Sequence, residues 1–390
     1  MRGRSRESDL GARVPRPIEQ NPCRREVESA VGRRAAPFLL VTRPVSQNVM
    51  QEVLQRFERD DPIALGGGAR WRVQRLEERR YSTIHLLTPT GDVASLRARI
   101  ASDALILKIY HAAQPPRRQR EFDDLRRVHV AMSPRAGVVQ PIACYADLGA
   151  VITARAGGSS AGSLVRSAVR RTADATILAR AAVACAEAGT WLGRFQTAGR
   201  SEMRGMRSPH LGDASAWLEY LDERLRILCD ARPGIEAPLR TRLLAHAAAT
   251  LQAIPAATLE AVTWSHGDFG PHNVLVGADT ITVLDLELAP QHPLFDAAYF
   301  TEALALHVGP WVDPSRVLRL QRAFLAGAGA SAAEPLFRLF CLRHLLCAYV
   351  SETRRHGVAT WKQWPGLLAL RARLRRFPDA LPLRPVRHAA

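Results

Sequence analysis

The spacing of apolar residues divides the chain into two parts of different character. Short strand-like runs occupy much of the stretch from 60 to 155, with strands expected at 71–76, 82–87, 105–110 and 151–154. A helix beginning near Arg117 lies between the last two runs. This part is therefore predicted to be a small antiparallel sheet with one helix.

After Gly157 and Gly158 the pattern becomes helical. Apolar residues recur at helical spacing in five segments, 173–196, 214–229, 238–251, 314–326 and 335–351. Two short apolar strands, 274–276 and 280–286, interrupt this series once. The pattern predicts an α+β bilobal fold, in which a smaller antiparallel lobe precedes a larger, mostly helical lobe.

The first residues follow neither pattern. Residues 1–45 are rich in Arg, Pro and Glu without periodicity, and are predicted to be a disordered basic extension. Ser46 then caps a plausible helix that carries an apolar face, so the smaller lobe is expected to span 46–155 and the larger one 156–390. The glycine run 66–68 is a turn and only a weak phosphate-loop candidate, because no strand precedes it.

Composition supports a globular protein. Hydrophobic residues make up 47% and charged residues 23% of the 390 positions, which excludes disordered and collagenous classes. No run approaches 18 uncharged apolar residues, so no membrane span is expected, and the basic N-terminus lacks the apolar core of a secretion signal. The six scattered cysteines include no C-x-x-C pair, which fits a reducing, cytoplasmic setting rather than disulfides or zinc.

The net charge of +17 raises the alternative of a basic protein that associates with nucleic acid. The basic residues, however, are spread along the chain and no nucleic-acid motif accompanies them, so nucleic acid is not the expected partner. Only two of the 54 Lys and Arg residues are lysines, Lys108 and Lys362. A lysine retained in an arginine-rich chain indicates a site that needs a compact ammonium group.

Residues 264–287 carry the strongest chemical signal. His266, Asp268 and Asn273 fit the template H-x-D-x-x-x-x-N, and a short hairpin and an apolar strand then lead to Asp285. Phosphoryl transfer needs a carboxylate beside the attacking hydroxyl and oxygen ligands for Mg²⁺ on the nucleotide phosphates. Asp268 is therefore expected to orient and deprotonate the hydroxyl, and Asn273 and Asp285 to bind the metal. A plain hairpin turn with a core histidine would explain single residues, but the complete spacing favours a kinase.

With these motifs the chain resembles the aminoglycoside phosphotransferase and choline kinase group of small-molecule kinases, over roughly residues 60 to 350. That group commonly has H-G-D-x-x-x-x-N in its catalytic loop, followed by a strand that ends in the metal-binding Asp. Leu286 stands where an aromatic residue is usual, Glu287 keeps the acid, and Asp296 matches a downstream P-L-x-D pattern. The resemblance implies the protein-kinase-like bilobal fold, with nucleotide bound by the N-terminal lobe and the catalytic loop and acceptor site in the C-terminal lobe.

Residues 268–270 spell D-F-G, the metal motif of protein kinases. An H-x-D loop should then precede it by some 15 to 20 residues, as the protein-kinase order requires. The stretch 245–256 offers His246 and no Asp. Asp268 is therefore assigned to the catalytic loop, and His266 to bracing that loop.

The kinase hypothesis also requires a phosphate-binding lysine and a helix glutamate that holds it. Lys108 lies on the strand 105–110, and Glu121 follows on a helix where it shares a face with Leu125 and Val128. The two are expected to form an ion pair, although a strand lysine is more often a solvated edge residue. The cofactors predicted are ATP or GTP, together with Mg²⁺.

The remaining contacts of the nucleotide are less defined. The expected turn after the first strand, within 76–83, lacks glycine, so its backbone amides and the hydroxyls of Ser82 or Thr83 are the candidates for the phosphates. Backbone groups of Ala154 and Ala156, in the hinge between the lobes, are the candidates for the base.

The acceptor is expected to be a small molecule bound by the larger lobe. Acids on the helix after Ala214 and near the metal strand would suit a cationic aminoglycoside or amino alcohol; they are Glu219, Asp222, Glu223, Glu287 and Glu302. The first three equally fit a solvated helix face, and the arginines would suit an anionic sugar. The predicted function is ATP- and Mg²⁺-dependent transfer of the γ-phosphate to a hydroxyl of a sugar, amino sugar or amino alcohol. The alternatives are a catalytically inactive, nucleotide-binding scaffold and the basic nucleic-acid-associated protein.

Overall fold

The structure is a computed structural model of the chain. It describes residues 47–63, 70–79, 81–91, 93–133, 137–203, 206, 214–278, 280–306, 311–355 and 364–377. The predicted extension 1–45, Ser46, the glycine run 66–68 and Lys362 lie outside these residues. None of the described helices is long and apolar enough to cross a membrane.

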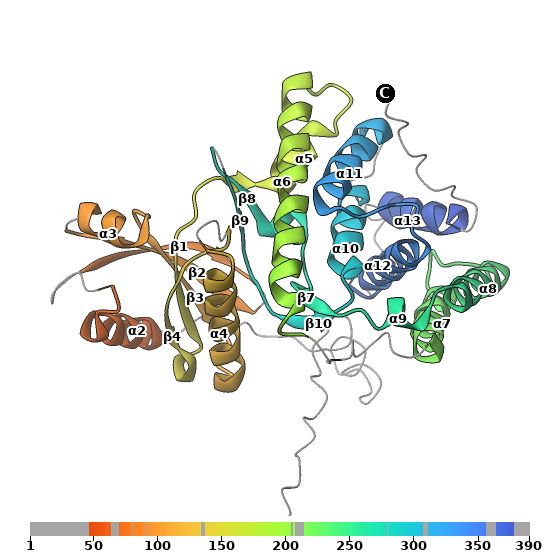
Figure 1. Ribbon diagram of the computed structural model, residues 1–390. Helices are drawn as coiled ribbons and strands as arrows, with labels where there is room; N and C mark the ends of the chain where they lie inside the picture. Colours follow the sequence, from red (N-terminus) through yellow and green to blue (C-terminus); the bar gives the residue numbers. More distant parts are fainter. Residues whose placement is uncertain are drawn as a thin grey trace, which may run out of the picture. The chain divides into compact units, whose positions relative to one another are not determined.

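A five-stranded antiparallel sheet forms the first part of the described chain. Its strands are β1 (Trp71–Glu78), β2 (Ser82–Pro89), β3 (Leu105–Tyr110), β4 (Pro141–Tyr145) and β5 (Ala150–Ala154), in the order β1-β2-β3-β5-β4. The helices of this part are α2 (Gln47–Asp60), α3 (Val93–Ile100) and α4 (Pro115–Ala131). All four predicted strands and the helix near Arg117 are confirmed, whereas β4 and α3 were not predicted (Figure 1).

Alternation along β3 explains how the sheet is anchored. Leu105, Leu107 and Ile109 are buried, and they pack in one apolar cluster with Val53 and Phe57 of α2. The intervening positions of β3, which include the lysine, remain partly exposed on the opposite face. The sheet therefore buries one face, and its opposite face carries Lys108 next to partly exposed apolar residues such as Ile84 and Ile106.

Helices dominate the rest of the chain. They are α5 (Ala161–Ala168), α6 (Ala175–Arg200), α7 (Ala214–Asp230), α8 (Ala237–Ala253), α9 (Ala256–Leu259), α10 (Leu294–Ala305), α11 (Pro314–Ala328), α12 (Pro335–Arg355) and α13 (Trp364–Arg376). All five predicted helices are present, and four further helices were not predicted. Short strands form two small sheets, one of β6 (Ser159–Ser160), β8 (Val274–Val276) and β9 (Ile281–Val283), the other of β7 (Thr263–Ser265) and β10 (Ala289–Gln291).

Two glycines let α6 and α11 lie directly against each other (Figure 1). A Cβ atom on Gly189 would come within 2.1 Å of the Phe324 carbonyl oxygen, and one on Gly327 within 2.1 Å of the Ala186 carbonyl oxygen. No side chain fits there, so the two helices make a close-packed platform. Phe269 of the predicted catalytic loop is fully buried against this platform and stacks on Trp191 of α6 at 5.4 Å.

The larger apolar cluster extends from α4 to α13. Leu125 and Val128 of α4 belong to it, although α4 follows β3 in sequence and precedes the expected lobe boundary. The face of α4 that was predicted to point inward is thus packed against the core of the helical part. The boundary near residue 155 remains a prediction.

Candidate active site

The loop that carries Asp268 runs from β7 to β8, and Asp285 lies two residues after β9. A short 3₁₀ turn, η2 (Pro271–Asn273), leads from the loop into β8. Because β8 and β9 pair as a hairpin with Val274 opposite Val283, they bring the end of the loop next to the segment that holds Asp285. The predicted strand 280–286 is shorter than expected, since only 281–283 are extended, and Asp285 adopts a left-handed backbone conformation with φ of 53°.

Asp296 ties the start of the loop to α10. Its carboxylate accepts hydrogen bonds from the Ser265 hydroxyl at 3.0 Å, the His266 amide at 2.7 Å and the Gly267 amide at 3.0 Å. Asp296 is completely buried and stands in the first turn of the helix, where a negative charge is favoured by the helix dipole. The buried His266 amide is therefore satisfied by Asp296, and the Gly267 amide is shared between Asp296 and the Ser265 hydroxyl, which lies at 3.1 Å.

His266 connects the loop to the residue before Asp285. With its proton on Nε2, the imidazole donates to the Leu284 carbonyl at 2.8 Å, and its Nδ1 accepts from the Asp268 amide at 3.4 Å. The ring is 1% exposed. His266 thus links two segments of the site, and its bracing role stays a prediction.

The Asp268 carboxylate accepts three hydrogen bonds from its surroundings. Tyr299 of α10 donates its hydroxyl to Oδ1 at 2.5 Å, while His272 Nε2 and Asn273 Nδ2 lie 3.3 and 3.1 Å from Oδ2. Burial acts to raise the pKa of Asp268, but the hydrogen bonds from His272 and Tyr299 outweigh it, so the pKa lies below its usual value. Asp268 in turn raises the pKa of His272. Nearly half of the Asp268 side chain, 48%, stays exposed and open to a ligand.

Asn273 is oriented by the same aspartate. Its amide nitrogen donates to the Asp268 backbone carbonyl at 2.9 Å as well as to the carboxylate. This leaves the amide oxygen of Asn273 without a hydrogen-bond partner among the described residues. An amide oxygen is the kind of ligand that a hard cation such as Mg²⁺ binds.

Two cations from the sheet region hold the Asp285 carboxylate. Lys108 Nζ lies 2.7 Å from Oδ1, and Arg79 Nη1 lies 2.9 Å from Oδ2. Burial would raise the pKa of Asp285, but Lys108 and Arg79 lower it to about 2. For Lys108 the burial effect, which lowers the pKa of an ammonium, is exceeded by the attraction of Asp285, so its pKa is raised.

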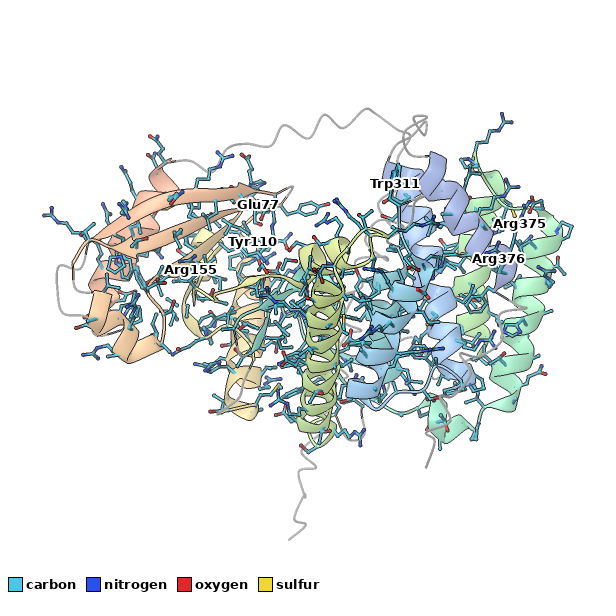
Figure 2. All side chains as sticks on the ribbon, turned by 90° about the horizontal axis from the view of Figure 1, so that it is seen from above. Glu77, Tyr110, Arg155, Trp311, Arg375 and Arg376 are labelled. Carbon is cyan, nitrogen blue, oxygen red and sulfur yellow. The ribbon has the colours of Figure 1, made fainter. Side chains whose placement is uncertain are left out.

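The predicted ion pair of Lys108 with Glu121 is present, with Nζ and Oε1 3.8 Å apart. Glu121 also accepts from the Tyr110 hydroxyl and from Arg118, whose Nη1 lies at 2.5 Å. Tyr110, the last residue of β3, is labelled in Figure 2. Three partners thus hold Glu121, and the lysine bridges Glu121 and Asp285.

For the other residues predicted to contact the nucleotide, the structure shows fewer groups that are free to bind it. Ser82 and Thr83 lie within β2 rather than in the turn, and each is only 3% exposed, so their hydroxyls are closed to a ligand. In the hinge, the Ala154 and Arg155 amides already donate to the Gln140 and Ala104 carbonyls. A contact of the base with Ala154 or Ala156 stays a prediction.

The candidate acceptor residues are not gathered at one point. Glu287 pairs with Arg117 of α4 at 3.0 Å, and Asp222 is held by Nε and Nη2 of Arg240, at 2.7 and 2.9 Å. Glu302 is buried against Arg373, and Glu219 is exposed on α7. No contact of the described residues links Glu219 or Asp222 to the catalytic loop, so of these acids only Glu287 is next to Asp285.

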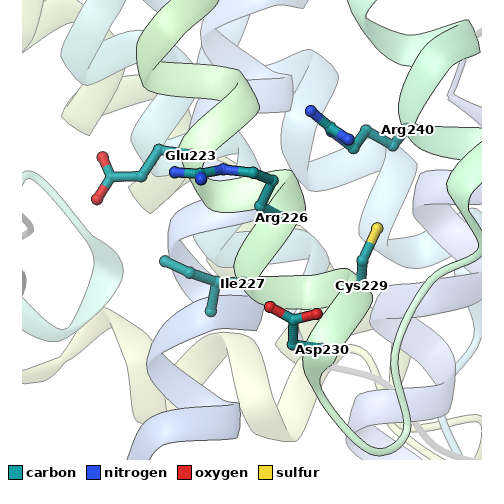
Figure 3. Close-up of a pocket in the computed structure, with 6 residues that line it drawn as sticks. All are labelled: Glu223, Arg226, Ile227, Cys229, Asp230 and Arg240. Carbon is teal, nitrogen blue, oxygen red and sulfur yellow. The ribbon is translucent and has the colours of Figure 1, made fainter.

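A separate cavity of about 370 Å³ lies along α7 and α8 (Figure 3). Its lining residues are Glu223, Arg226, Ile227, Cys229, Asp230 and Arg240. None of them belongs to the catalytic segment. The cavity does not account for the phosphoryl-transfer motif.

Four residues of the site were missed or left without a role by the sequence analysis. Arg79 and Tyr299 were not named as candidates, and His272 and Asp296 were given no role. Tyr299 could have been found from Asp296, because residues three apart on a helix share a face. No local signal identifies Arg79, since it lies 206 residues from Asp285 in sequence.

The donor atoms suit Mg²⁺ better than a transition metal. No group of three or more His, Cys, Asp or Glu side chains that could hold a metal occurs among the described residues. Mg²⁺ is usually bound by one or two carboxylates together with waters and substrate phosphates, rather than by a full protein cage. The Asp285 carboxylate and the free oxygen of Asn273 fit that requirement.

Comparisons with known proteins agree with this geometry. Residues 89–336 match the phosphotransferase enzyme family, and no curated protein sequence matches significantly. A crystal structure from Ralstonia eutropha JMP134, provisionally assigned as an aminoglycoside phosphotransferase, is 12% identical with a TM-score of 0.55, and the match covers 84% of this chain and 97% of that one. A choline/ethanolamine kinase family protein from Mesorhizobium loti is 15% identical with a TM-score of 0.50, over 85% and 95% of the two chains. The fold is thus the α+β, protein-kinase-like fold of small-molecule phosphotransferases, and the chain belongs to the phosphotransferase enzyme family.

Proposed function

We propose that this phosphotransferase transfers the γ-phosphate of ATP, with Mg²⁺, to a hydroxyl of a small molecule. The observation that carries the proposal is the pair of ionised aspartates. Asp268 has a lowered pKa and a half-exposed carboxylate, and Asp285 has a pKa of about 2 and lies against Lys108. Both are therefore charged at neutral pH, one available to an acceptor and one surrounded by cations.

Asp268 serves the acceptor hydroxyl. Its Oδ1 is fixed by Tyr299 and its Oδ2 by His272 and Asn273, so the carboxylate keeps one orientation while a ligand approaches. A group with a lowered pKa is a weak base in the ground state. Because phosphoryl transfer passes through a loose transition state, positioning contributes more than early proton removal, and the proton moves to Asp268 as the new bond forms.

Asn273 and Asp285 hold the metal, and Lys108, braced by Glu121, binds the phosphates. When bound, Mg²⁺ neutralises charge on the phosphates and fixes their orientation. Lys108 is suited to its task because a strongly raised pKa keeps it charged although it is largely buried. Its link to Glu121 keeps the ammonium in place when Asp285 binds the metal.

The acceptor is a sugar, an amino sugar or an amino alcohol. Once the nucleotide and metal engage Asp285 and Lys108, Asp268 and Glu287 remain on the acceptor side, with Arg117 as the counter-charge of Glu287. Since Arg117 pairs with Glu287, the negative charge of Asp268 is the one that favours an acceptor that carries an amino group.

A nucleotide-consumption screen tests the proposal. The full chain is incubated with ATP or GTP and with sugars, amino alcohols and aminoglycosides, with and without Mg²⁺, beside Asp268→Asn as the control. We expect Mg²⁺-dependent ADP formation that requires one acceptor class and is nearly lost in the variant. Binding of ATP without turnover on any acceptor would instead favour an inactive nucleotide-binding scaffold.

A further inference from the structure

Both oxygens of the Asp285 carboxylate are engaged by side-chain cations. Lys108 holds Oδ1 at 2.7 Å and Arg79 holds Oδ2 at 2.9 Å. A divalent cation that approached Asp285 in this arrangement would meet two positive charges at close range. At least one of the two side chains has to move before the carboxylate can bind a metal.

The surroundings of the two cations show which one moves. Lys108 belongs to the middle strand β3, is 20% exposed and is also held by Glu121. Arg79 follows β1 in the turn to β2, is 41% exposed and has Glu77 as its other partner, at 3.0 Å. Glu77 is labelled on the hairpin in Figure 2. Arg79 is therefore less constrained than Lys108 and is the side chain that leaves Asp285 more readily.

Several other donors of the described residues in and after this turn are engaged or buried. The Arg79 amide donates to the Ser82 carbonyl at 2.8 Å, and the hydroxyls of Ser82 and Thr83 are buried in β2. Among the described residues of this turn, Arg79 is thus the one whose side chain contacts Asp285. The planar arrangement of N–H groups in the Arg79 guanidinium fits two phosphate oxygens at once.

We propose that Arg79 is a triphosphate-binding residue, which rests on Asp285 in the nucleotide-free protein and moves to the nucleotide phosphates when ATP·Mg²⁺ binds. The inference rests on the proposed function. In this proposal the Arg79 side chain binds the nucleotide phosphates, as backbone amides do in a glycine-rich loop. The exchange also frees Asp285 for the metal at the moment the nucleotide arrives.

Calorimetry on the full chain at saturating Mg²⁺ tests this assignment, with ATP and adenosine as ligands. Arg79→Ala is expected to weaken ATP binding by roughly tenfold to a hundredfold, the effect of one charge-assisted interaction, and to leave adenosine binding unchanged. Arg79→Lys is expected to fall between the parent and Arg79→Ala, because a point charge replaces the fork. Arg75→Ala is the matched control, since Arg75 lies on β1, the strand that precedes Arg79, is 55% exposed and pairs with Glu78 rather than Asp285.

The outcomes separate the two claims. If the parent binds ATP and Arg79→Ala binds it as tightly as Arg75→Ala does, the assignment of Arg79 is wrong and the proposed function stands. If Arg79→Ala loses affinity for adenosine to the same extent, the residue shapes the fold of the hairpin and the assignment is again wrong. If the parent itself binds no nucleotide, the proposed function fails and the inference fails with it. Melting curves of each variant verify that it is folded.

Discussion

Asp268 and Asp285 lie close together in the chain but are held in opposite ways. Asp268 is held from within the helical part, by uncharged or weakly basic donors from its own turn and from α10. Asp285 is held from outside that part, by the full charges of Lys108 on β3 and Arg79 in the turn after β1. One aspartate is positioned by its own surroundings, and the other depends on side chains of the sheet region.

The difference is consistent with the two chemical tasks proposed for these aspartates. An acceptor-binding carboxylate needs a fixed direction, which short hydrogen bonds from rigid elements provide. A metal-binding carboxylate needs at least one of its cationic partners to leave, and ion pairs at a partly exposed site are exchanged at small cost. Substitutions on the Asp268 side are therefore expected to affect stability and turnover, and those on the Asp285 side to affect ligand binding and pH response.

The largest effect is expected from Asp296→Ala, which breaks the Asp268 side. The change leaves the buried His266 amide and the buried Ser265 hydroxyl without their acceptor, so the free energy of unfolding should fall by about 3–5 kcal/mol. Urea unfolding measures this loss. Asp174→Ala is the control, because Asp174 caps α6 at an exposed position and its loss should cost only about 1 kcal/mol. Equal losses in the two variants would contradict the anchoring role of Asp296.

A smaller effect is expected from Tyr299→Phe. Loss of the hydroxyl removes one hydrogen bond that orients Asp268, so kcat should fall about tenfold. The pKa of Asp268 should rise, since Tyr299 helps to lower it, and the acidic limb of the pH–rate profile should shift to higher pH. Tyr349→Phe, which removes a hydroxyl bonded to the Pro233 carbonyl, should leave the profile unchanged. A profile that did not move in Tyr299→Phe would argue against the contact with Asp268.

The smallest effect concerns the pH dependence of stability on the Asp285 side. The pKa of Asp285 is lowered from 3.8 to about 2 in the folded chain, so its ionised form stabilises the fold above about pH 4. This contribution is lost as the pH falls through the window from 3.8 to about 2. The difference in unfolding free energy between the parent and Asp285→Asn should therefore shrink from pH 5 to pH 2. A difference that stayed constant over that range would show that the ion pairs with Arg79 and Lys108 do not stabilise the fold.

The residues of the candidate site that lie close together in the chain could be predicted from the sequence alone. Asp268, Asn273 and Asp285 lie within 18 consecutive residues, because a short hairpin joins them, and their spacing could be recognised directly. Lys108 was identified from the scarcity of lysine and the alternation of β3. The fold class followed from periodicity, since most strands and long helices have one apolar face.

Two kinds of feature could not be predicted from the sequence. They are contacts between residues that lie far apart in the chain, and a helix that has no periodic apolar face. Helix α10 was overlooked because nine of its twelve residues are buried, so it has no polar face to mark a helical period. Tyr299 was missed with it. Arg79 is one of many arginines in this chain, and only the fold brings its side chain to Asp285.

The most direct test of the central claim compares Asp268→Asn with Asp285→Asn in one set of titrations. Calorimetry with ATP, with and without Mg²⁺, is combined with turnover on the acceptor found in the screen. We predict that Asp268→Asn binds ATP·Mg²⁺ like the parent but turns over about 10² to 10⁴ times more slowly, whereas Asp285→Asn loses the Mg²⁺-dependent part of binding as well. Parent-like binding and turnover in both variants would contradict the kinase assignment. Loss of nucleotide binding in Asp268→Asn alone would mean that the two aspartates have exchanged roles.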